Sequence, residues 1–143
     1  MTLIADTGGL YALYDADDAH HSAVREVIEK EPGQIIVPVA ILSELDYLLR
    51  RRLGVNAELD LLDSLLQGAF ALEPMTDEDL LRCRELIAQY RDLDLGIADA
   101  AVAATAERLG VKRILTLDER DFRNLVPKGG GSFLLLPFDA WLT

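Results

Sequence analysis

The sequence has one cysteine, no long apolar run and few cations, and each shortage excludes a class of protein. Its single cysteine, Cys83, rules out an internal disulfide bond and any zinc site built from several cysteines. No apolar run approaches the roughly 18 residues that a membrane-spanning helix needs. No signal segment led by Lys or Arg precedes the first strand-like run. We therefore expect a cytoplasmic protein with no membrane partner.

Cations are outnumbered by acids along the whole chain. Lysine and arginine total 14 against 25 aspartates and glutamates, a net charge of −11. This balance argues against tight, nonspecific DNA binding, because that binding draws its affinity from many cations that release counterions. It also raises the question of where so many carboxylates lie.

Short apolar runs alternate with longer helix-like stretches over the 143 residues. The strand-like runs are 3–5, 35–37, 70–72, 114–117 and 133–136. Apart from Thr116 they are apolar throughout, as strands buried on both faces are. The helix-like stretches lie near residues 9–15, 20–31, 39–53, 57–67, 77–92 and 97–109. This alternation predicts an α/β fold of three layers, with a mostly parallel sheet of about five strands between helices. No repeat or linker divides the chain, so we predict one domain over residues 1–143.

Three aspartates come directly after strand-like runs or soon after them. Asp6 ends the first run, in Leu-Ile-Ala-Asp-Thr, and Asp118 follows the run that ends at residue 117. Asp121 comes three residues later, on a short helical turn. Open parallel sheets bind ligands at the carboxyl ends of their strands, near the switch in strand order. Each aspartate also suits a helix N-cap, and spacing alone does not decide between Asp118 and Asp121.

Two further acids lie on helix-like stretches with apolar neighbours. Glu44 has apolar residues three and four positions away. Its carboxylate is therefore paired, protonated or metal-bound, or it lies at the rim of a buried face and reaches water. Asp99 begins an alanine-rich stretch that must be buried nearly all round, although the helix dipole also favours an acid there. Asp94 and Gly96 precede it and are available as caps, which leaves Asp99 free for another role.

Together these positions predict a group of carboxylates in one cleft. Three or four converging carboxylates repel one another strongly unless a cation compensates them. Mg²⁺ and Mn²⁺ take all-oxygen ligand sets, and such sites serve phosphate chemistry. We therefore interpret these acids as candidate ligands of a divalent cation.

The same residues resemble the PIN-domain family, and more narrowly the VapC ribonuclease toxins of VapBC toxin–antitoxin pairs. The resemblance covers essentially the whole chain and rests on four stretches: Asp6-Thr7, Ser43-Glu44, Leu95-Gly-Ile-Ala-Asp99-Ala and Leu115-Thr-Leu-Asp118 with Asp121-Phe122. It implies a PIN-like fold and an endoribonuclease that depends on Mg²⁺ or Mn²⁺. In such an enzyme Asp6, Glu44 and Asp99 match three acidic metal-site positions. Asp118 is the best match to the fourth position, and Asp121 is a second candidate for it.

The resemblance also implies supporting residues and partners. Thr7 and Thr116 match hydroxyl positions that support the site, whereas Gly8 stands where such toxins often carry Ser or Asn. The implied partners are an RNA substrate, a second copy of the chain and a small VapB-like antitoxin. An antitoxin arginine is suited to plug an acidic cleft, because its planar fork pairs with carboxylates. The apolar residues we expect to form the antitoxin's docking groove are Leu10, Tyr11, Leu13, Tyr14, Leu45, Leu48 and Leu49.

Other functions fit parts of the pattern. Asp6-Thr7-Gly8 spells the aspartic-protease signature, but those enzymes are β-rich and need a second such loop or a homodimer, whereas this chain is strongly helical and has no second loop. A metal-dependent phosphotransferase with Asp6 as its nucleophile stays open, although it leaves Glu44 and Asp99 unexplained. An inert binding module, in which the acids are caps and surface charge, also stays open.

Overall fold

The five apolar runs pair as parallel strands in the structure, a computed structural model that describes residues 2–142. The strands lie in the order β3-β2-β1-β4-β5, and every neighbouring pair is parallel. The predicted five-stranded parallel sheet is therefore confirmed. Its strands are β1 (Thr2–Ala5), β2 (Gln34–Pro38), β3 (Ala71–Glu73), β4 (Arg113–Leu115) and β5 (Leu134–Leu136).

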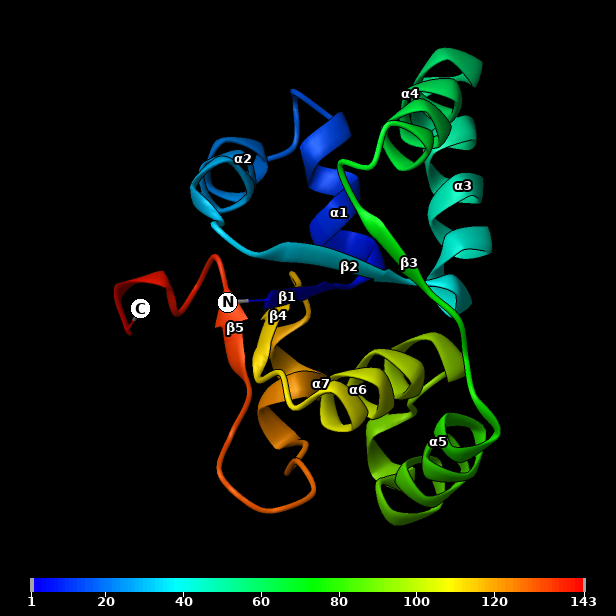
Figure 1. Ribbon diagram of the computed structural model, residues 1–143, viewed down its shortest axis with the longest axis vertical. Coiled ribbons are helices and arrows are strands. Elements are labelled where there is room, and N and C mark those ends of the chain that lie inside the picture. Colours follow the sequence, from blue (N-terminus) through cyan, green and yellow to red (C-terminus); the bar gives the residue numbers. More distant parts are fainter. Residues whose placement is uncertain (1, 143) are drawn as a thin grey trace.

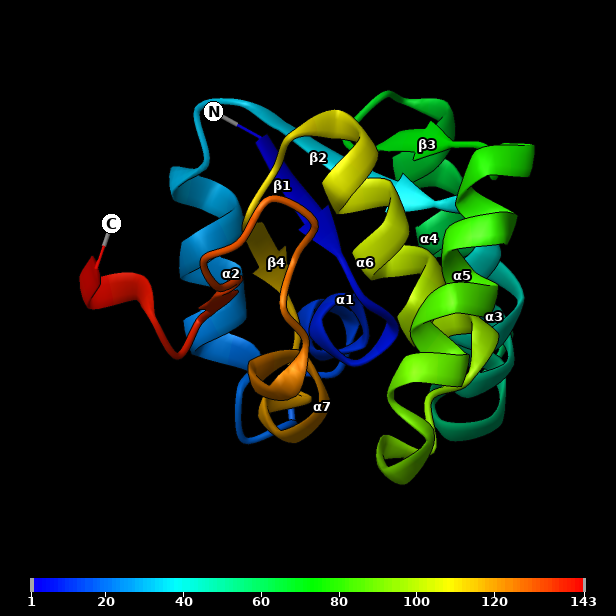
Figure 2. The same ribbon diagram turned by 90° about the horizontal axis from the view of Figure 1, so that it is seen from below.

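Helices cover both faces of the sheet, which confirms the three-layer α/β/α architecture (Figures 1 and 2). One layer holds α1 (Thr7–Tyr14), α2 (His21–Lys30), α3 (Val39–Leu53) and α4 (Val55–Leu66). The opposite layer holds α5 (Asp77–Gln89), α6 (Ile97–Leu109) and α7 (Glu119–Asn124). Two short 3-10 turns complete the described residues: η1 (Arg91–Leu93) and η2 (Ala140–Leu142). None of the helices within residues 2–142 has the length and apolar character of a membrane span.

The strand order places β1 at the switch point of the sheet. The chain runs from β1 outward to β2 and β3, then returns to the other side of β1 to form β4 and β5. The carboxyl end of β1 therefore opens between two oppositely directed sets of crossovers, where ligands of such sheets bind. Asp6 is the first residue after β1, so the fold places its side chain at this opening.

One glycine lets α1 approach the end of β4. The backbone N–H of Asp6 donates to the carbonyl oxygen of Leu115 at 2.9 Å. A Cβ atom on Gly9, in the first turn of α1, would lie 2.4 Å from the same carbonyl oxygen. Only glycine fits a backbone contact this close, so Gly9 fixes how α1 sits on the sheet.

Alanines let α6 pack tightly between the sheet and α5. The side chains of Ala100, Ala101 and Ala104 are buried together with Cys83 of α5. Burial raises the pKa of the Cys83 thiol to about 11, so this thiol is a packing group and not a nucleophile. At the start of α5, Thr76 and Asp79 form the capping box that the sequence predicts.

The prediction that these apolar residues form the antitoxin's docking groove is wrong, because most of them lie inside the core. Leu10, Leu45 and Leu49 have no exposed surface, and Tyr11 is also buried. The remaining three, Leu13, Tyr14 and Leu48, are partly buried and pack against the same core. The apolar faces of α1 and α3 pack against each other, and their buried residues belong to the core that includes the sheet.

Candidate metal centre

Asp6 is held by a hydroxyl from the neighbouring strand. Its side chain does not cap α1; its Oδ2 accepts a hydrogen bond from Thr116 Oγ1 at 2.8 Å. The same Thr116 oxygen accepts a hydrogen bond from the backbone N–H of Asp118 at 3.0 Å. Both Asp6 and Thr116 are buried. One hydroxyl thus couples the Asp6 carboxylate to the turn that carries Asp118.

Three carboxylates converge next to this pair. Asp99, Asp118 and Asp121 each offer an oxygen, and these oxygens all lie within 4.8 Å of one another. Asp118 also caps α7, because its Oδ1 accepts from the backbone N–H of Asp121 at 3.0 Å. Asp99 lies in the first turn of α6 but does not cap it; the N-cap residue is Gly96. The structure therefore brings both candidates for the fourth acid, Asp118 and Asp121, together with Asp99.

Asp6 and Glu44 lie outside this group of three but close enough to interact with it. The negative charge of Glu44 helps to raise the pKa values of both Asp6 and Asp99. Its own side chain is exposed, although α3 buries the adjacent Leu45. Of the alternatives for Glu44, the rim position that reaches water is the one the structure has.

Burial and mutual repulsion make the carboxylates of the centre hard to ionise. Burial raises the pKa of Asp6 to about 6; the hydrogen bond from Thr116 opposes this shift, and the charges of Asp118 and Glu44 add to it. Burial, followed by the charges of Asp6 and Asp118, raises the pKa of Asp99 to about 7. Burial and the charge of Asp118 also raise the pKa of Asp121. The centre therefore retains protons near neutral pH until a cation compensates its charge.

The residues present fit a hard divalent cation. Within residues 2–142 no lysine or arginine forms an ion pair with any of the five acids. The charge of Arg120 lowers the pKa of Asp121, but the pKa values of Asp6, Asp99 and Asp121 stay raised, so the repulsion is not fully compensated. All candidate donors are oxygens, which suits Mg²⁺ or Mn²⁺. Next to Asp6, the buried Thr7 Oγ1 has no hydrogen-bond partner in the described part of the chain. An unsatisfied buried hydroxyl beside uncompensated carboxylates indicates a polar site built for a further group, either an ion or its water.

The model of the PIN-domain family matches residues 3–126. The chain belongs to the PIN-domain family. This PIN domain is 39% identical over 135 residues to Ribonuclease VapC26 of Mycobacterium tuberculosis, covering 94% of this chain and 100% of that protein. These two matches confirm the resemblance to PIN domains and VapC ribonucleases that the sequence motifs indicate.

Solved structures share the fold of this PIN domain. Mycobacterium tuberculosis VapC20, a toxin that cleaves the sarcin–ricin loop, is 22% identical with a TM-score of 0.77, and the match covers 82% of this chain and 91% of that chain. VapBC2 from Rickettsia felis, bound to a fragment of its promoter DNA, is 14% identical with a TM-score of 0.66, covering 94% and 97% of the two chains. The α/β/α arrangement described above is therefore the one found in VapC structures.

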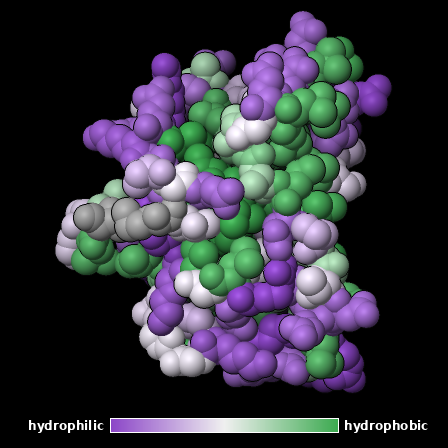
Figure 3. Space-filling view, viewed as in Figure 1, coloured by the Kyte–Doolittle hydropathy of each residue, from purple (hydrophilic) through white to green (hydrophobic). Residues whose placement is uncertain are grey.

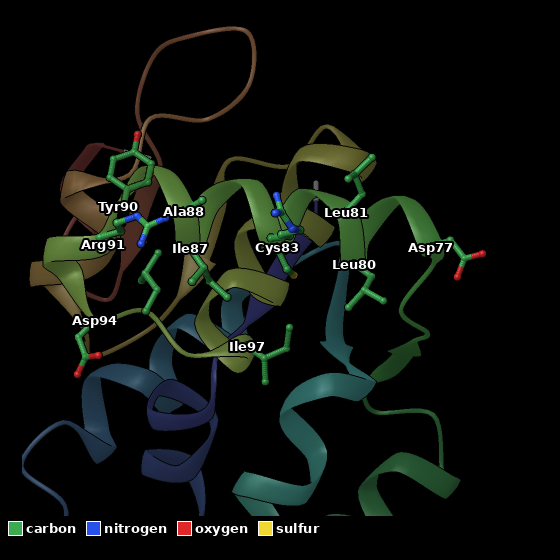
Figure 4. A pocket seen from close by; sticks show the side chains of 12 residues that line it. Asp77, Leu80, Leu81, Cys83, Ile87, Ala88, Tyr90, Arg91, Asp94 and Ile97 are labelled. Atoms are coloured by element: carbon green, nitrogen blue, oxygen red, sulfur yellow. The ribbon is translucent and has the colours of Figure 1, made fainter.

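Sequence reasoning missed a surface beside the centre. Leu80 shares an apolar side of α5 with the buried Cys83, yet it is 52% exposed and lines a groove next to the start of α6 (Figure 4). The sequence does carry a signal for this surface, which is the width of the apolar side of α5. With Leu81 and Ala88, the apolar side of α5 is wider than the part of a helix that faces a core.

Proposed function

We propose that this PIN domain is a divalent-metal-dependent endoribonuclease, the toxin of a VapBC-type pair, that works as a homodimer and is neutralised by an antitoxin. The convergence of Asp99, Asp118 and Asp121 beside Asp6, with no ion pair to a lysine or arginine among residues 2–142, carries the proposal. The 39% identity to a named ribonuclease supports RNA as the substrate.

The acids have distinct roles in the proposed hydrolysis. Asp6, Glu44, Asp99 and Asp118 hold Mg²⁺ or Mn²⁺ directly or through water, with Asp121 beside Asp118 as a further ligand. When bound, the cation supplies positive charge for the scissile phosphate and lowers the pKa of a water molecule that attacks phosphorus. Thr116 keeps the Asp6 carboxylate fixed and oriented through its hydrogen bond, so this ligand is preorganised. Asp99 and Asp6 release their retained protons as the cation binds, so binding strengthens as pH rises.

We place the antitoxin on α4, whose outer side is apolar and acidic. Four side chains of α4 at spacings of three and four are exposed: Val55, Leu59, Leu62 and Leu66. The space-filling view shows apolar surface over α4 (Figure 3). The helix carries three acids and no lysine or arginine. An amphipathic antitoxin helix with apolar anchors and basic flanks complements such a face, and an arginine beyond it reaches the acidic cleft.

The proposed reaction is tested by RNA cleavage with and without cation. We expect the purified chain to cut members of a pool of structured RNAs, including a sarcin–ricin hairpin, in Mn²⁺ or Mg²⁺. EDTA, the variant Asp99→Asn and an excess of the antitoxin should each abolish cleavage. Cleavage that persists in EDTA would contradict the metal dependence.

The two alternative functions, a phosphotransferase and an inert binding module, predict different results for the same purified protein. A phosphotransferase with Asp6 as its nucleophile forms a hydroxylamine-sensitive phosphoenzyme, and the ribonuclease does not. An inert module binds no cation at a specific site and cuts no RNA.

A further inference from the structure

Three consecutive arginines end α3, the helix that carries Glu44 of the metal centre. Arg50, Arg51 and Arg52 all lie in the last turn of α3, and all three are exposed. The dipole of a helix favours cations in its last turn, so their position alone implies no ligand. What each arginine contacts within the chain is therefore the evidence for any further role.

Two of the three arginines have neighbours within the chain that account for them, and Arg51 does not. Arg52 lies over the ring of Tyr11, 5.2 Å from the ring centroid. The charge of Arg50 acts on Glu58 of α4. Within residues 2–142 Arg51 forms neither an ion pair nor a side-chain hydrogen bond, although acids outnumber cations 25 to 14 in the sequence. The guanidinium of Arg51 is thus available to a ligand.

Arg51 shares one exposed face of α3 with Glu44 and Tyr47. Positions 44, 47 and 51 are three and four residues apart, so their side chains follow one another along one side of the helix. The ring of Tyr47 is unusually accessible for an aromatic side chain, because the residue is 60% exposed. A helix rises about 1.5 Å per residue, so Arg51 lies about 10 Å beyond Glu44 along the axis. The face therefore leads from a metal-centre acid to an aromatic ring and then to an unpaired cation.

We infer that this α3 face, from Glu44 to Arg51, binds single-stranded RNA beside the scissile phosphate, with the ring of Tyr47 stacked on a base and the guanidinium of Arg51 on a phosphate. This inference rests on the proposed ribonuclease function and names where its substrate lies. Aromatic rings that stack on bases, beside cations that follow the backbone, are a general way of holding a single strand. A base stacked on Tyr47 is splayed out of any duplex, so the nucleotide next to the cut is unpaired.

The charge of this face favours RNA over the antitoxin as its occupant. The antitoxin helix proposed for α4 has basic flanks, which the unpaired Arg51 would repel. RNA is a polyanion, and phosphate contacts from arginine fix the position of a strand without reading its sequence. The ring of Tyr47 suits any base, because every base has a π face.

The stacking contact is tested by the fluorescence anisotropy of a labelled single-stranded oligoribonucleotide, in EDTA so that the strand is not cut. Tyr47→Ala should raise the dissociation constant about fivefold or more, because the stacked base loses its platform. Tyr47→Phe keeps an aromatic ring and should bind like the unsubstituted chain. The matched control is Trp141→Ala in η2, which lies across the molecule from α3 (Figures 1 and 2). Trp141 is 82% exposed, and its loss should leave the dissociation constant unchanged.

The phosphate contact is tested by the salt dependence of the same binding. Arg51→Ala should make the plot of log affinity against log salt concentration shallower by about 0.7, the contribution of one phosphate contact on a single strand. Tyr47→Ala should keep the slope, because stacking releases no counterion. Lys128→Ala removes another exposed cation without an ion pair, near the end of α6 opposite Asp99, and should also keep the slope. An arginine that only complements the helix dipole would lower the melting temperature when removed and leave the slope unchanged.

Unchanged affinity in Tyr47→Ala, or an unchanged salt slope in Arg51→Ala, would overturn the inference. Equal losses in the two control variants would overturn it as well. Retained RNA affinity with lost antitoxin binding in Tyr47→Ala would assign the face to the antitoxin instead.

Cleavage in Mn²⁺ separates this inference from the proposed function. Because the contacts lie outside the reacting phosphate, both α3 variants should raise KM and leave kcat unchanged. If both variants bind and cut RNA like the unsubstituted chain, the ribonuclease stands and only the position of the strand is wrong. If the unsubstituted chain neither binds nor cuts RNA, the proposed function itself fails.

Discussion

At the scale of single residues, the carboxylate of Asp99 is the most consequential group in the centre. Its pKa of about 7 comes first from burial and then from the charges of its acidic neighbours. We expect Asp99→Asn to lower RNA cleavage by about two orders of magnitude or more, because a charged ligand is lost from the reacting site. The same change should raise the melting temperature in EDTA, because it removes one repelling charge.

The control for this variant is Asp92→Asn on the exposed η1 turn, which removes one charge outside the cluster and should keep activity. A lower melting temperature in EDTA, with cleavage retained, would show that Asp99 has a structural role and is not a ligand.

Asp118 and Asp121 differ in which neighbours they influence. The charge of Asp118 raises the pKa values of both Asp6 and Asp99, whereas Asp121 acts on Asp99. We therefore expect Asp118→Asn to reduce cleavage about tenfold more than Asp121→Asn, each measured as kcat at saturating cation. Asparagine is as good an N-cap as aspartate, so Asp118→Asn should keep α7 and report on charge. Equal or reversed losses would assign the fourth role to Asp121.

At the scale of elements, the contact between α1 and β4 sets the distance between the two strand ends that carry Asp6 and Thr116. Gly9→Ala forces a Cβ atom against the Leu115 carbonyl, so we expect a loss of about 2–3 kcal/mol in the free energy of unfolding. Cleavage should fall as well, because α1 begins directly after Asp6. Urea denaturation measures the first effect.

Gly8→Ala is the paired control. Its Cβ would meet only Leu117 Cβ, at an ordinary 3.8 Å, so it should gain about 0.5 kcal/mol from helix propensity. Equal stability losses in the two variants would mean that the close approach at Gly9 is not what holds α1.

Local sequence patterns predict the helices and strands well. They do not predict contacts between residues that are far apart in the sequence. Helices 39–53 and 97–109 have the bounds that the sequence predicts, since Pro38, Gly54 and Gly110 mark their ends locally. The hydrogen bond from Thr116 to Asp6 joins residues 110 positions apart, and no spacing rule reveals it. The burial of Leu45 and Leu49 likewise depends on where α1 packs, so periodicity finds an apolar face without showing what covers it.

At the scale of the whole molecule, the raised carboxyl pKa values make the stability of the metal-free protein depend on pH. Asp6 and Asp99 titrate at 3.8 when unfolded and at about 6 and about 7 when folded. Between these values the folded state binds more protons, so the free energy of unfolding falls as pH rises from about 4 to about 7. Asp139, whose pKa is lowered by its pairing with Arg123, titrates below this window.

Melting temperatures in EDTA from pH 4.5 to 8 check this dependence. We expect a decline across the window, a shallower decline in Asp99→Asn, and recovery at pH 7.5 when Mn²⁺ is added. A melting temperature that rises through the window in EDTA would contradict the raised pKa values.

The central claim is that the acids at the carboxyl edge of the sheet form a divalent-cation site. Isothermal titration of the purified protein with Mn²⁺ at pH 7.5 tests it most directly. We predict saturable binding with proton release, lost in Asp99→Asn and retained in Asp92→Asn. No saturable binding in the unsubstituted protein, or equal binding in Asp99→Asn, would contradict the account.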